Sequence, residues 1–590
     1  MSGAVTTLAG AIEGLYGERA EATLAAVLDR IERAPAGAAR DLPADWHQQP
    51  GRVGYAAYAD RFGGDLAGVE AHIPYLVELG VEVLHLMSVL RPRAGENDGG
   101  FAVADYRSPD PRLGTLDDLR SLSSSLRAAG IRLCLDLVLN HTSDDHEWAR
   151  KARAGSAYHR ALYHVFEDRT LPDRYERTLP HVFPELAPGN FTFVPELDGW
   201  VWTTFHDYQW DLDWSNPDVL LEMVDVVLHL AELGVDMVRL DAIAFTWKRL
   251  GTDCQNQPEA HLVAAALRAV LRLAAPGVVT LAEAIVGPDH LLAYLDECDL
   301  AYHNQLMVMG WSMLAERNAS LATAALKRLD PAPPHAAWLT YVRCHDDIGW
   351  AVDDVDAAAV GLSGSAHRAF LTAFYRGDFP GSFARGTPFS NAPDGDERTC
   401  GMTSTLTGLA AADATDATDA ADSDLALRRY LLLYALAFGY GGIPLIWMGD
   451  ELALGDGPAG ADTRWLQRPA MDWAAAERRH DPSTREGAVW AGLRRLVSAR
   501  RACPALHAAA SVRPVDVGEP AVFAWLRQHE EHGTLLGLAN VGEQEVHVDP
   551  VVLDLLGTPH GIDLLAPADE APDTPLTTLA PLQVRWCVPG

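Results

Sequence analysis

Carboxylate, imidazole and guanidinium side chains stand at the ends of several apolar segments of this chain. The segment VDMVRLDA, residues 235–242, contains Arg239 and Asp241, two positions apart. Alternate residues of a strand point to the same face, so this guanidinium and this carboxylate face the same space. Several charged groups are costly to desolvate together unless a site requires them. Other apolar segments end in Asp136, in Glu283 and in the run His345, Asp346 and Asp347.

Glycoside cleavage is a reaction that needs several carboxyl groups in one pocket. A retaining enzyme uses one carboxylate as the nucleophile and a protonated carboxyl group as general acid and then base. Burial and a like-charged neighbour raise the pKa of the acid, whereas an adjacent guanidinium keeps the nucleophile ionised. Arg239 could supply that guanidinium, which predicts Asp241 as the nucleophile and Glu283 as the acid/base. The alternative for Arg239 and Asp241 is a buried structural ion pair, which often stabilises little.

The elements that must position these residues form a repeating pattern. Eight apolar runs alternate with amphipathic stretches of helix length, and they cover residues 53–59, 81–87, 131–140, 235–242, 278–284, 299–303, 338–346 and 442–451. Eight strands that alternate with helices predict an α/β fold, a (β/α)8 TIM barrel. The carboxyl ends of barrel strands form one mouth, where catalytic residues lie.

Two long interruptions and both ends of the chain complete the predicted organisation. Each interruption follows the carboxyl end of a strand, so both should form walls of the mouth. From about residue 508, short alternating runs predict a small antiparallel β domain. The predicted parts are an N-terminal helical segment 1–48, barrel parts 49–140, 216–348 and 416–507, a B-type insertion 141–215, a B'-type insertion 349–415, and a C-terminal β-sandwich domain 508–590.

Composition limits the partners and the location. The chain has 47 Lys and Arg against 81 Asp and Glu, a formal charge of −34, which argues against nucleic acid as a partner. No apolar run reaches the length of a membrane span, and no basic region precedes an apolar core as in a signal peptide. Seven scattered cysteines without a CxxC pair fit a reducing compartment. We therefore expect a cytoplasmic protein, a monomer or a homodimer.

A metal site is the alternative interpretation of one acidic segment. The run SDDHEWA, residues 143–149, offers several oxygen ligands. A Ca²⁺ site needs more convergent carbonyl and carboxylate oxygens, and Ser143 with Asp144 fits the start of a helix. We expect no metal and no other cofactor.

Four segments resemble, in order, the four signature regions of the α-amylase superfamily, glycoside hydrolase family thirteen. They are DLVLNH (136–141), VRLDAIAF (238–245), AEAIV (282–286) and VRCHDDIGW (342–350). These regions alone specify only the superfamily. The stretches between them, such as WVWTTFHDYQWDLDWSNP, FTWKRLGTDCQNQP and ADTRWLQRP, resemble amylosucrases and the related sucrose hydrolases over nearly the whole chain.

The resemblance implies how a glucosyl ring would be held. It gives Asp241 and Glu283 the roles derived above. Asp346 would hydrogen-bond the 2- and 3-hydroxyls of the distorted ring and so stabilise the transition state. His141 and His345 would contact hydroxyls of the same ring.

The resemblance also implies how the pocket is closed and where the acceptor binds. Asp98 and Arg464 would pair at the bottom of the pocket, so that only a terminal glucosyl unit fits. Asp347 and Arg398 would lie on the fructosyl or acceptor side, with Phe205 beside them.

One position departs from the family. Phe101 stands where amylosucrases typically carry Tyr to stack on the glucose. Phe keeps the stacking face and loses the hydroxyl, so we expect an altered affinity and a retained activity.

The function that the resemblance implies is transfer of glucose from sucrose to an α-1,4-glucan, such as glycogen or a malto-oligosaccharide, with release of fructose. With water as the acceptor the same residues would make a sucrose hydrolase, and a sucrose-isomerising transglucosylase is a related alternative. An alternative of another class is a non-catalytic carbohydrate-binding homologue. The intact set of Asp241, Glu283 and Asp346 argues against it.

Overall fold

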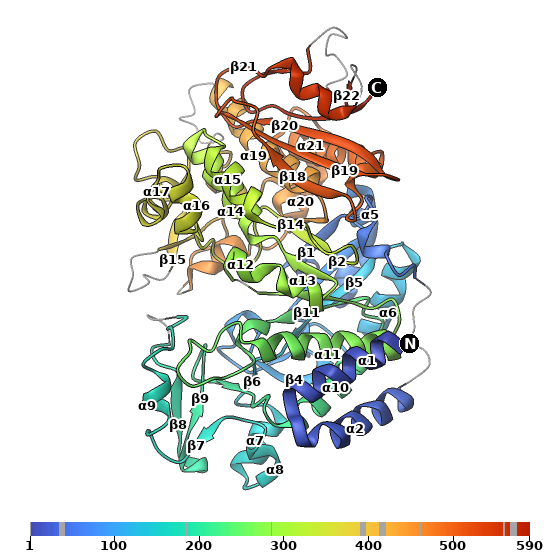
Figure 1. Ribbon diagram of the computed structural model, residues 1–590, viewed down its shortest axis with the longest axis vertical. Coiled ribbons are helices and arrows are strands. Elements are labelled where there is room, and N and C mark those ends of the chain that lie inside the picture. Colours follow the sequence, from blue (N-terminus) through green and yellow to red (C-terminus); the bar gives the residue numbers. More distant parts are fainter. Residues whose placement is uncertain are drawn as a thin grey trace.

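Eight parallel strands close into a barrel at the centre of the molecule (Figure 1). The computed structural model describes residues 2–34, 42–183, 187–284, 286–389, 397–411, 420–460, 462–557, 561–566 and 575–590. Around the barrel the strands follow their order in the chain. They are β1 (Gly54–Tyr58), β2 (Val83–Met87), β5 (Arg132–Val138), β11 (Met237–Asp241), β12 (Val279–Ala282), β13 (Leu300–Tyr302), β14 (Ala337–Tyr341) and β17 (Ile443–Trp447). Each predicted apolar run overlaps one of these strands, so the predicted TIM barrel is confirmed.

Helices cover the outside of the barrel, which is why its strands are apolar on both faces. Every residue of β2, β11, β14 and β17 is buried. Two of the covering helices begin at capping side chains: α6 (Leu116–Ala128) has a capping box of Thr115 and Asp118, and α10 (Pro217–Glu232) has Asn216. Further covering helices are α5 (Ile73–Leu79), α11 (Pro258–Ala274), α14 (Asn304–Glu316), α19 (Ala420–Tyr440) and α21 (Arg485–Arg501).

Two helices at the N-terminus pack on this outer layer. α1 (Ser2–Tyr16) lies against α11, and α2 (Ala20–Arg33) lies against α10 (Figure 1). Arg30 of α2 forms an ion pair with Asp225 of α10, with 3.2 Å between Nε and Oδ2.

The segment between β5 and α10 forms small sheets and short helices below the barrel in Figure 1. β6 (His141–Ser143) pairs antiparallel with β10 (Gln209–Asp211). β7 (Val165–Phe166), β9 (Gly199–Trp202) and β8 (Phe191–Val194) form a three-stranded sheet. α7 (Glu147–Arg153) begins at His146, whose side chain caps it. The expectation that Ser143 and Asp144 start this helix was therefore wrong: Ser143 belongs to β6, and its hydroxyl accepts a hydrogen bond from the Asp145 N–H.

The segment between β14 and α19 carries helices and one short hairpin. It contains α16 (Asp354–Ala359), α17 (Gly364–Arg376), α18 (Thr403–Leu406) and the antiparallel pair β15 (Thr387–Phe389) and β16 (Arg398–Cys400). The predicted boundary between this insertion and the barrel, at residues 415 and 416, lies outside the described residues.

The chain ends in antiparallel sheets, as predicted. Five strands pair in the order β18 (Ser511–Val515), β19 (Val522–His529), β20 (Gly533–Asn540), β24 (Val584–Pro589) and β22 (Gly561–Asp563). The Trp525 indole of β19 donates to the Gly439 carbonyl of α19 at 2.9 Å, which anchors this sheet on the barrel. No helix among the described residues is long and apolar enough to span a lipid bilayer.

Candidate active site

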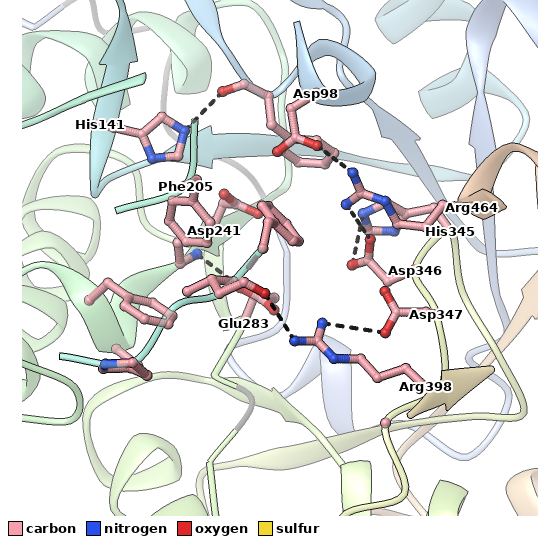
Figure 2. A pocket seen from close by; sticks show the side chains of 18 of the residues that line it. Asp98, His141, Phe205, Asp241, Glu283, His345, Asp346, Asp347, Arg398 and Arg464 are labelled. Carbon is pink, nitrogen blue, oxygen red and sulfur yellow. Dashed lines mark hydrogen bonds and ion pairs between the residues drawn. The ribbon is translucent and has the colours of Figure 1, made fainter. Parts of the chain in front are cut away.

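A cavity of about 400 Å³ opens at the carboxyl ends of the barrel strands (Figure 2). The structure brings all of the predicted site residues together there, from strand ends, from loops and from both insertions. They are Asp98, Phe101, His141, Phe205, Arg239, Asp241, Glu283, His345, Asp346, Asp347, Arg398 and Arg464.

Arg239 and Asp241 project from β11 into the same space. Arg239 Nη1 donates to Asp241 Oδ1 at 2.7 Å and to Asp136 Oδ1 at 2.9 Å. On the neighbouring strand, Ala282 is in register with Leu240, so Glu283 follows β12 beside Asp241. Glu283 Oε2 accepts the Ala242 N–H at 2.9 Å. The two carboxyl groups therefore stand on adjacent strands, whose spacing in a sheet is about 4.8 Å.

These two carboxyl groups are electrostatically linked. Burial raises the pKa of Asp241, and the charge of Glu283 adds to that effect, whereas Arg239 opposes it. Burial also raises the pKa of Glu283, again opposed by Arg239. Two buried carboxyl groups so arranged titrate as a pair, and the pair retains one proton at a pH where an exposed carboxyl group has lost it.

Asp136 fixes Arg239 from the other side. Its Oδ1 lies 3.0 Å from His85 Nε2, and its Oδ2 accepts the Ser88 N–H at 2.9 Å. Burial alone would raise the pKa of Asp136. The electrostatic effect of His85 and Arg239 outweighs burial and holds this pKa below its usual range. The guanidinium of Arg239 is thus held between two carboxylates.

Asp98 and Arg464, which the resemblance predicted as a pair, form an ion pair in the lining of the cavity. Arg464 Nη2 donates to Asp98 Oδ1 at 2.8 Å, and Arg464 Nε also donates to both oxygens of Asp462, at 3.1 and 3.0 Å. Burial opposes ionisation of Asp98, but Arg464 outweighs it and holds the pKa of Asp98 well below its usual range. Gln209 Nε2 is 3.4 Å from Asp98 Oδ2.

His141 and His345 face the cavity as neutral rings. Burial lowers the pKa of His141 to about 4, and burial with the nearby Arg468 and Arg239 lowers the pKa of His345 well below its usual value. The Phe101 ring stacks on His345 with 5.3 Å between centroids and 22° between planes.

The loop after β14 gives the neighbouring residues Asp346 and Asp347 different partners. Asp346 Oδ2 lies 3.2 Å from His345 Nε2. Asp347 Oδ2 lies 3.4 Å from Nη1 of Arg398, whose Nη2 donates to the Val182 carbonyl at 3.2 Å. Arg398 of one insertion therefore links the barrel loop to the other insertion.

An aromatic wall completes the cavity. Phe205 contacts His141 and Phe245, with 5.2 Å between ring centroids in each case, and Phe183 lies 6.1 Å away.

Sequence reasoning missed several residues of the site. Phe183, Phe245, Gln255 and Arg468 line the cavity, and Gln209 and Asp462 contact residues that do. Arg468 lies in ADTRWLQRP, four positions after Arg464, and this spacing was the one signal that could have found it.

A buried ammonium group occupies a cage of oxygen atoms beside the site. Lys248 Nζ donates to Asp211 Oδ2 at 2.6 Å, to the Phe245 carbonyl at 2.8 Å, to Asn140 Oδ1 at 3.1 Å and to Thr204 Oγ1 at 3.3 Å. Such an oxygen set suits a hard cation, and here the lysine supplies the positive charge.

One set of possible metal ligands stands out among the residues that the structure describes. Cys344, His345 and Asp346 have donor atoms within 4.8 Å of one another. Two of them are predicted sugar contacts. All seven cysteines are free thiols.

Comparison with known proteins assigns the chain that forms this cavity to a family. The profile described as "Alpha amylase, catalytic domain" matches residues 31–352. Trehalose synthase of Thermus thermophilus is 31% identical over 416 residues, which cover 70% of this chain and 38% of that protein. Trehalose synthase/amylase TreS of Mycolicibacterium smegmatis is 33% identical over 53% of this chain and 54% of its own length, so this chain spans about half or less of both. Glucosylglycerate phosphorylase of Escherichia coli is 26% identical over 98% of each chain.

Solved structures share the fold at low sequence identity. Sucrose 6F-phosphate phosphorylase from Thermoanaerobacter thermosaccharolyticum has a TM-score of 0.65 at 17% identity, over 83% of this chain and 94% of that chain. Trehalulose synthase MutB from Pseudomonas mesoacidophila has a TM-score of 0.63 at 18% identity, over 93% and 100%.

Proposed function

This chain belongs to the alpha-amylase family, and on that basis we propose that it is a retaining glucosyltransferase that cleaves sucrose and passes the glucosyl unit to an α-1,4-glucan. The observation that carries the proposal is the ion pair of Asp98 with Arg464 in the cavity that Asp241 and Glu283 also line. In the proposal this pair closes the cavity beyond the linked Asp241 and Glu283, so that only a terminal glucosyl unit fits. Relatives named for trehalose, trehalulose and sucrose phosphate fit a disaccharide substrate. The stretches between the four signature regions resemble amylosucrases and sucrose hydrolases, and this resemblance favours sucrose.

The proton that the pair retains lies on Glu283 in this proposal. Arg239 donates to Asp241 at 2.7 Å and so favours the charge on that side chain. Glu283 gives its proton to the oxygen that bridges glucose and fructose, while the bond from that oxygen to the glucosyl C1 breaks. Asp241 Oδ1 is held by Arg239, and Oδ2 attacks C1 to form a covalent β-glucosyl enzyme as fructose leaves.

The second step reverses these roles. The Glu283 carboxylate accepts the proton of an acceptor hydroxyl, and the oxygen of that hydroxyl attacks C1 and displaces Asp241. Two inversions at C1 restore the α configuration. When the acceptor is the 4-hydroxyl of a glucan, the product is an α-1,4-glucan.

Neutral imidazoles and one carboxylate hold the glucosyl ring. His141 and His345 carry no charge at neutral pH, because burial lowers the pKa of each. They therefore act as hydrogen-bonding groups beside the cationic transition state without repelling it. Asp346 accepts bonds from ring hydroxyls as positive charge develops, which stabilises the transition state more than the ground state.

The acceptor decides between transfer and hydrolysis. In the proposal Arg398, Asp347 and Phe205, which line the same cavity, form the acceptor side. A glucan bound there excludes water from C1. If water reaches C1 instead, the same residues make a sucrose hydrolase, and if fructose returns through another hydroxyl, the product is a sucrose isomer.

Product analysis tests the proposal. The protein is incubated with sucrose alone and with added glycogen, and free glucose and fructose are measured separately. Fructose in excess over glucose, with a gap that widens on adding glycogen, is the expected result. Equal amounts identify a hydrolase, and a new disaccharide identifies an isomerase.

The matched control variant is Glu283→Gln. It should abolish release of fructose and unfold at the wild-type temperature. Near-normal turnover by this variant would contradict the assignment of the acid/base. If the wild-type protein releases neither sugar, the proposal is wrong.

A further inference from the structure

The loop that carries His345, Asp346 and Asp347 has no regular secondary structure, so something else must fix it. Buried side chains bind its backbone carbonyls. The Arg343 guanidinium donates to the Cys344 carbonyl at 3.1 and 2.9 Å and to the Asp346 carbonyl at 2.9 Å. Arg343 therefore holds the main chain on both sides of His345, including that of Asp346 itself.

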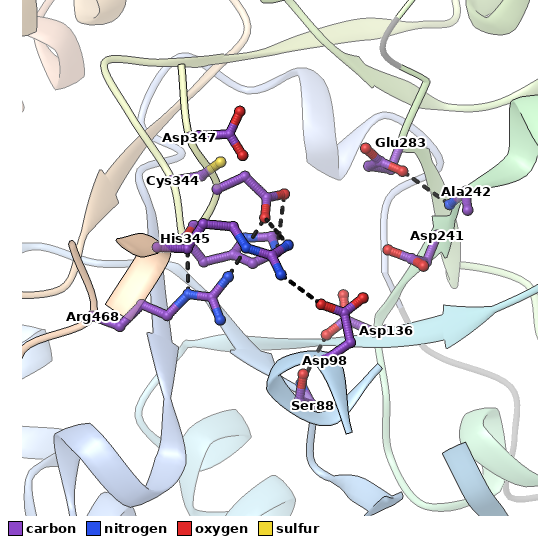
Figure 3. Close-up of polar contacts among 12 residues, drawn as sticks. Ser88, Asp98, Asp136, Asp241, Ala242, Glu283, Cys344, His345, Asp347 and Arg468 are labelled. Atoms are coloured by element: carbon purple, nitrogen blue, oxygen red, sulfur yellow. Dashed lines mark hydrogen bonds and ion pairs between the residues drawn. The ribbon is translucent and has the colours of Figure 1, made fainter. Parts of the chain in front are cut away.

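The His345 carbonyl is held by two consecutive residues of the loop after β17. Gln467 Nε2 donates to it at 3.1 Å. Arg468 Nε donates to it at 2.9 Å, as Figure 3 shows. Only one of the two also reaches a site carboxylate: Arg468 Nη2 lies 3.5 Å from Asp346 Oδ1. One guanidinium thus fixes both the main chain and the side chain of the turn that presents Asp346.

Asp346 needs this support because its side chain is partly open. It is 28% exposed, whereas Arg468 is 2% exposed. On its other oxygen the carboxylate meets His345 Nε2 at 3.2 Å. Arg464 is more distant, with 3.9 Å between Nη1 and Oδ1 of Asp346.

Arg468 is itself held in one place. Its guanidinium lies over the rings of Tyr58 and Trp465, 5.4 and 5.1 Å from their centroids. A Cβ on Gly99, which has a φ of +66°, would lie 2.6 Å from Arg468 Nη1. The glycine therefore leaves the space that the guanidinium uses.

We propose that Arg468 is a positioning residue for Asp346, which holds its carboxylate where the glucosyl 2- and 3-hydroxyls arrive. This inference rests on the proposed function, because it assigns Asp346 to the transition state. Misplacing a group by about 1 Å can lower a rate about 100-fold. Because the bonds of Asp346 strengthen in the transition state, the loss falls on kcat and leaves KM little changed.

Three variants test the proposal: Arg468→Met, Arg468→Lys and, as a matched control, Gln467→Leu. The control removes one bond to the same carbonyl, together with the bond that the Gly401 N–H donates to Gln467 Oε1, and leaves the Arg468 contact with Asp346 in place. We expect Arg468→Met to lower kcat for sucrose about 100-fold at nearly constant KM. Arg468→Lys should recover part of this loss, because its ammonium can approach Asp346, and Gln467→Leu should stay close to wild type.

Equal losses in Arg468→Met and Gln467→Leu would overturn the proposal, since they would show that only the carbonyl bond matters. A raised KM with unchanged kcat would also overturn it. If Arg468→Met does not unfold cooperatively, the test rests on Arg468→Lys alone. A kcat of Arg468→Lys equal to that of the wild-type protein then refutes the positioning role of Arg468. The wild-type protein tests the proposed function separately: if it does not cleave sucrose, the variants are compared on trehalose and maltose.

Discussion

Replacing Arg239 with Met should disable the proposed nucleophile, Asp241, and leave the shape of the cavity nearly unchanged. Arg239 Nη1 is 2.7 Å from Asp241 Oδ1, which puts the centres of the two charges about 4 Å apart. At an effective dielectric constant of about 20, that attraction is about 4 kcal/mol. It corresponds to about 3 pKa units of Asp241, because one unit is about 1.4 kcal/mol.

The sign of the effect follows from which form reacts. In the proposed mechanism Asp241 must be ionised, and Arg239 lowers its pKa against burial and the charge of Glu283. Without Arg239 the pKa of Asp241 rises, so the lower limb of the pH profile of kcat/KM moves to higher pH. Glu283 must be protonated in the same molecule, so fewer molecules are productive at any pH. We expect kcat/KM for sucrose at neutral pH to fall by about 10³-fold.

The assay is the pH dependence of fructose release by wild type, Arg239→Met and Arg239→Lys. Lys keeps the positive charge, so its lower limb should move less than that of Met. Arg239→Met also removes one partner of Asp136. Breaking a buried ion pair lowers the free energy of unfolding by about 3–5 kcal/mol. Rates are therefore compared only where thermal unfolding shows a folded protein. A folded Arg239→Met with the wild-type lower limb would refute the reasoning and favour a purely structural ion pair.

Two further perturbations test buried charges that the reaction does not use. Lys248→Met leaves Asp211 buried without its cation, so the free energy of unfolding should fall by about 3–5 kcal/mol. An unchanged denaturation midpoint would show that the oxygen cage needs no cation. Burial raises the pKa of Glu451 to about 7, so the folded protein holds a proton that the unfolded chain releases near pH 4, at about its model-peptide pKa. This contribution to stability is complete below the unfolded pKa and is lost as pH rises to about 7. Glu451→Gln, which has no carboxyl group to titrate, should lose less stability than wild type between these two pH values, and identical pH profiles would contradict this.

The barrel could be predicted because its signal is local. Each strand is a short apolar run, and burial on both faces leaves few other arrangements for eight such runs between helices. The same logic found the residues that end a run, such as Asp241, Glu283 and His345. Asp98, Arg398 and Arg464 lie on loops and in an insertion, where no periodicity fixes direction, so only resemblance suggested them.

The supporting residues could not be found in this way, for a physical reason. Arg343, Gln467 and Arg468 act on main-chain carbonyls, which every residue carries, so no partner side chain marks the contact in the sequence. The proposed catalytic residues thus lie at strand ends, and in the proposal the loops above them determine which sugars enter the cavity. The family of the protein follows from the motifs that end its strands and from the profile that matches residues 31–352, whereas the proposed acceptor side depends on contacts between loops, such as that between Arg398 and Asp347.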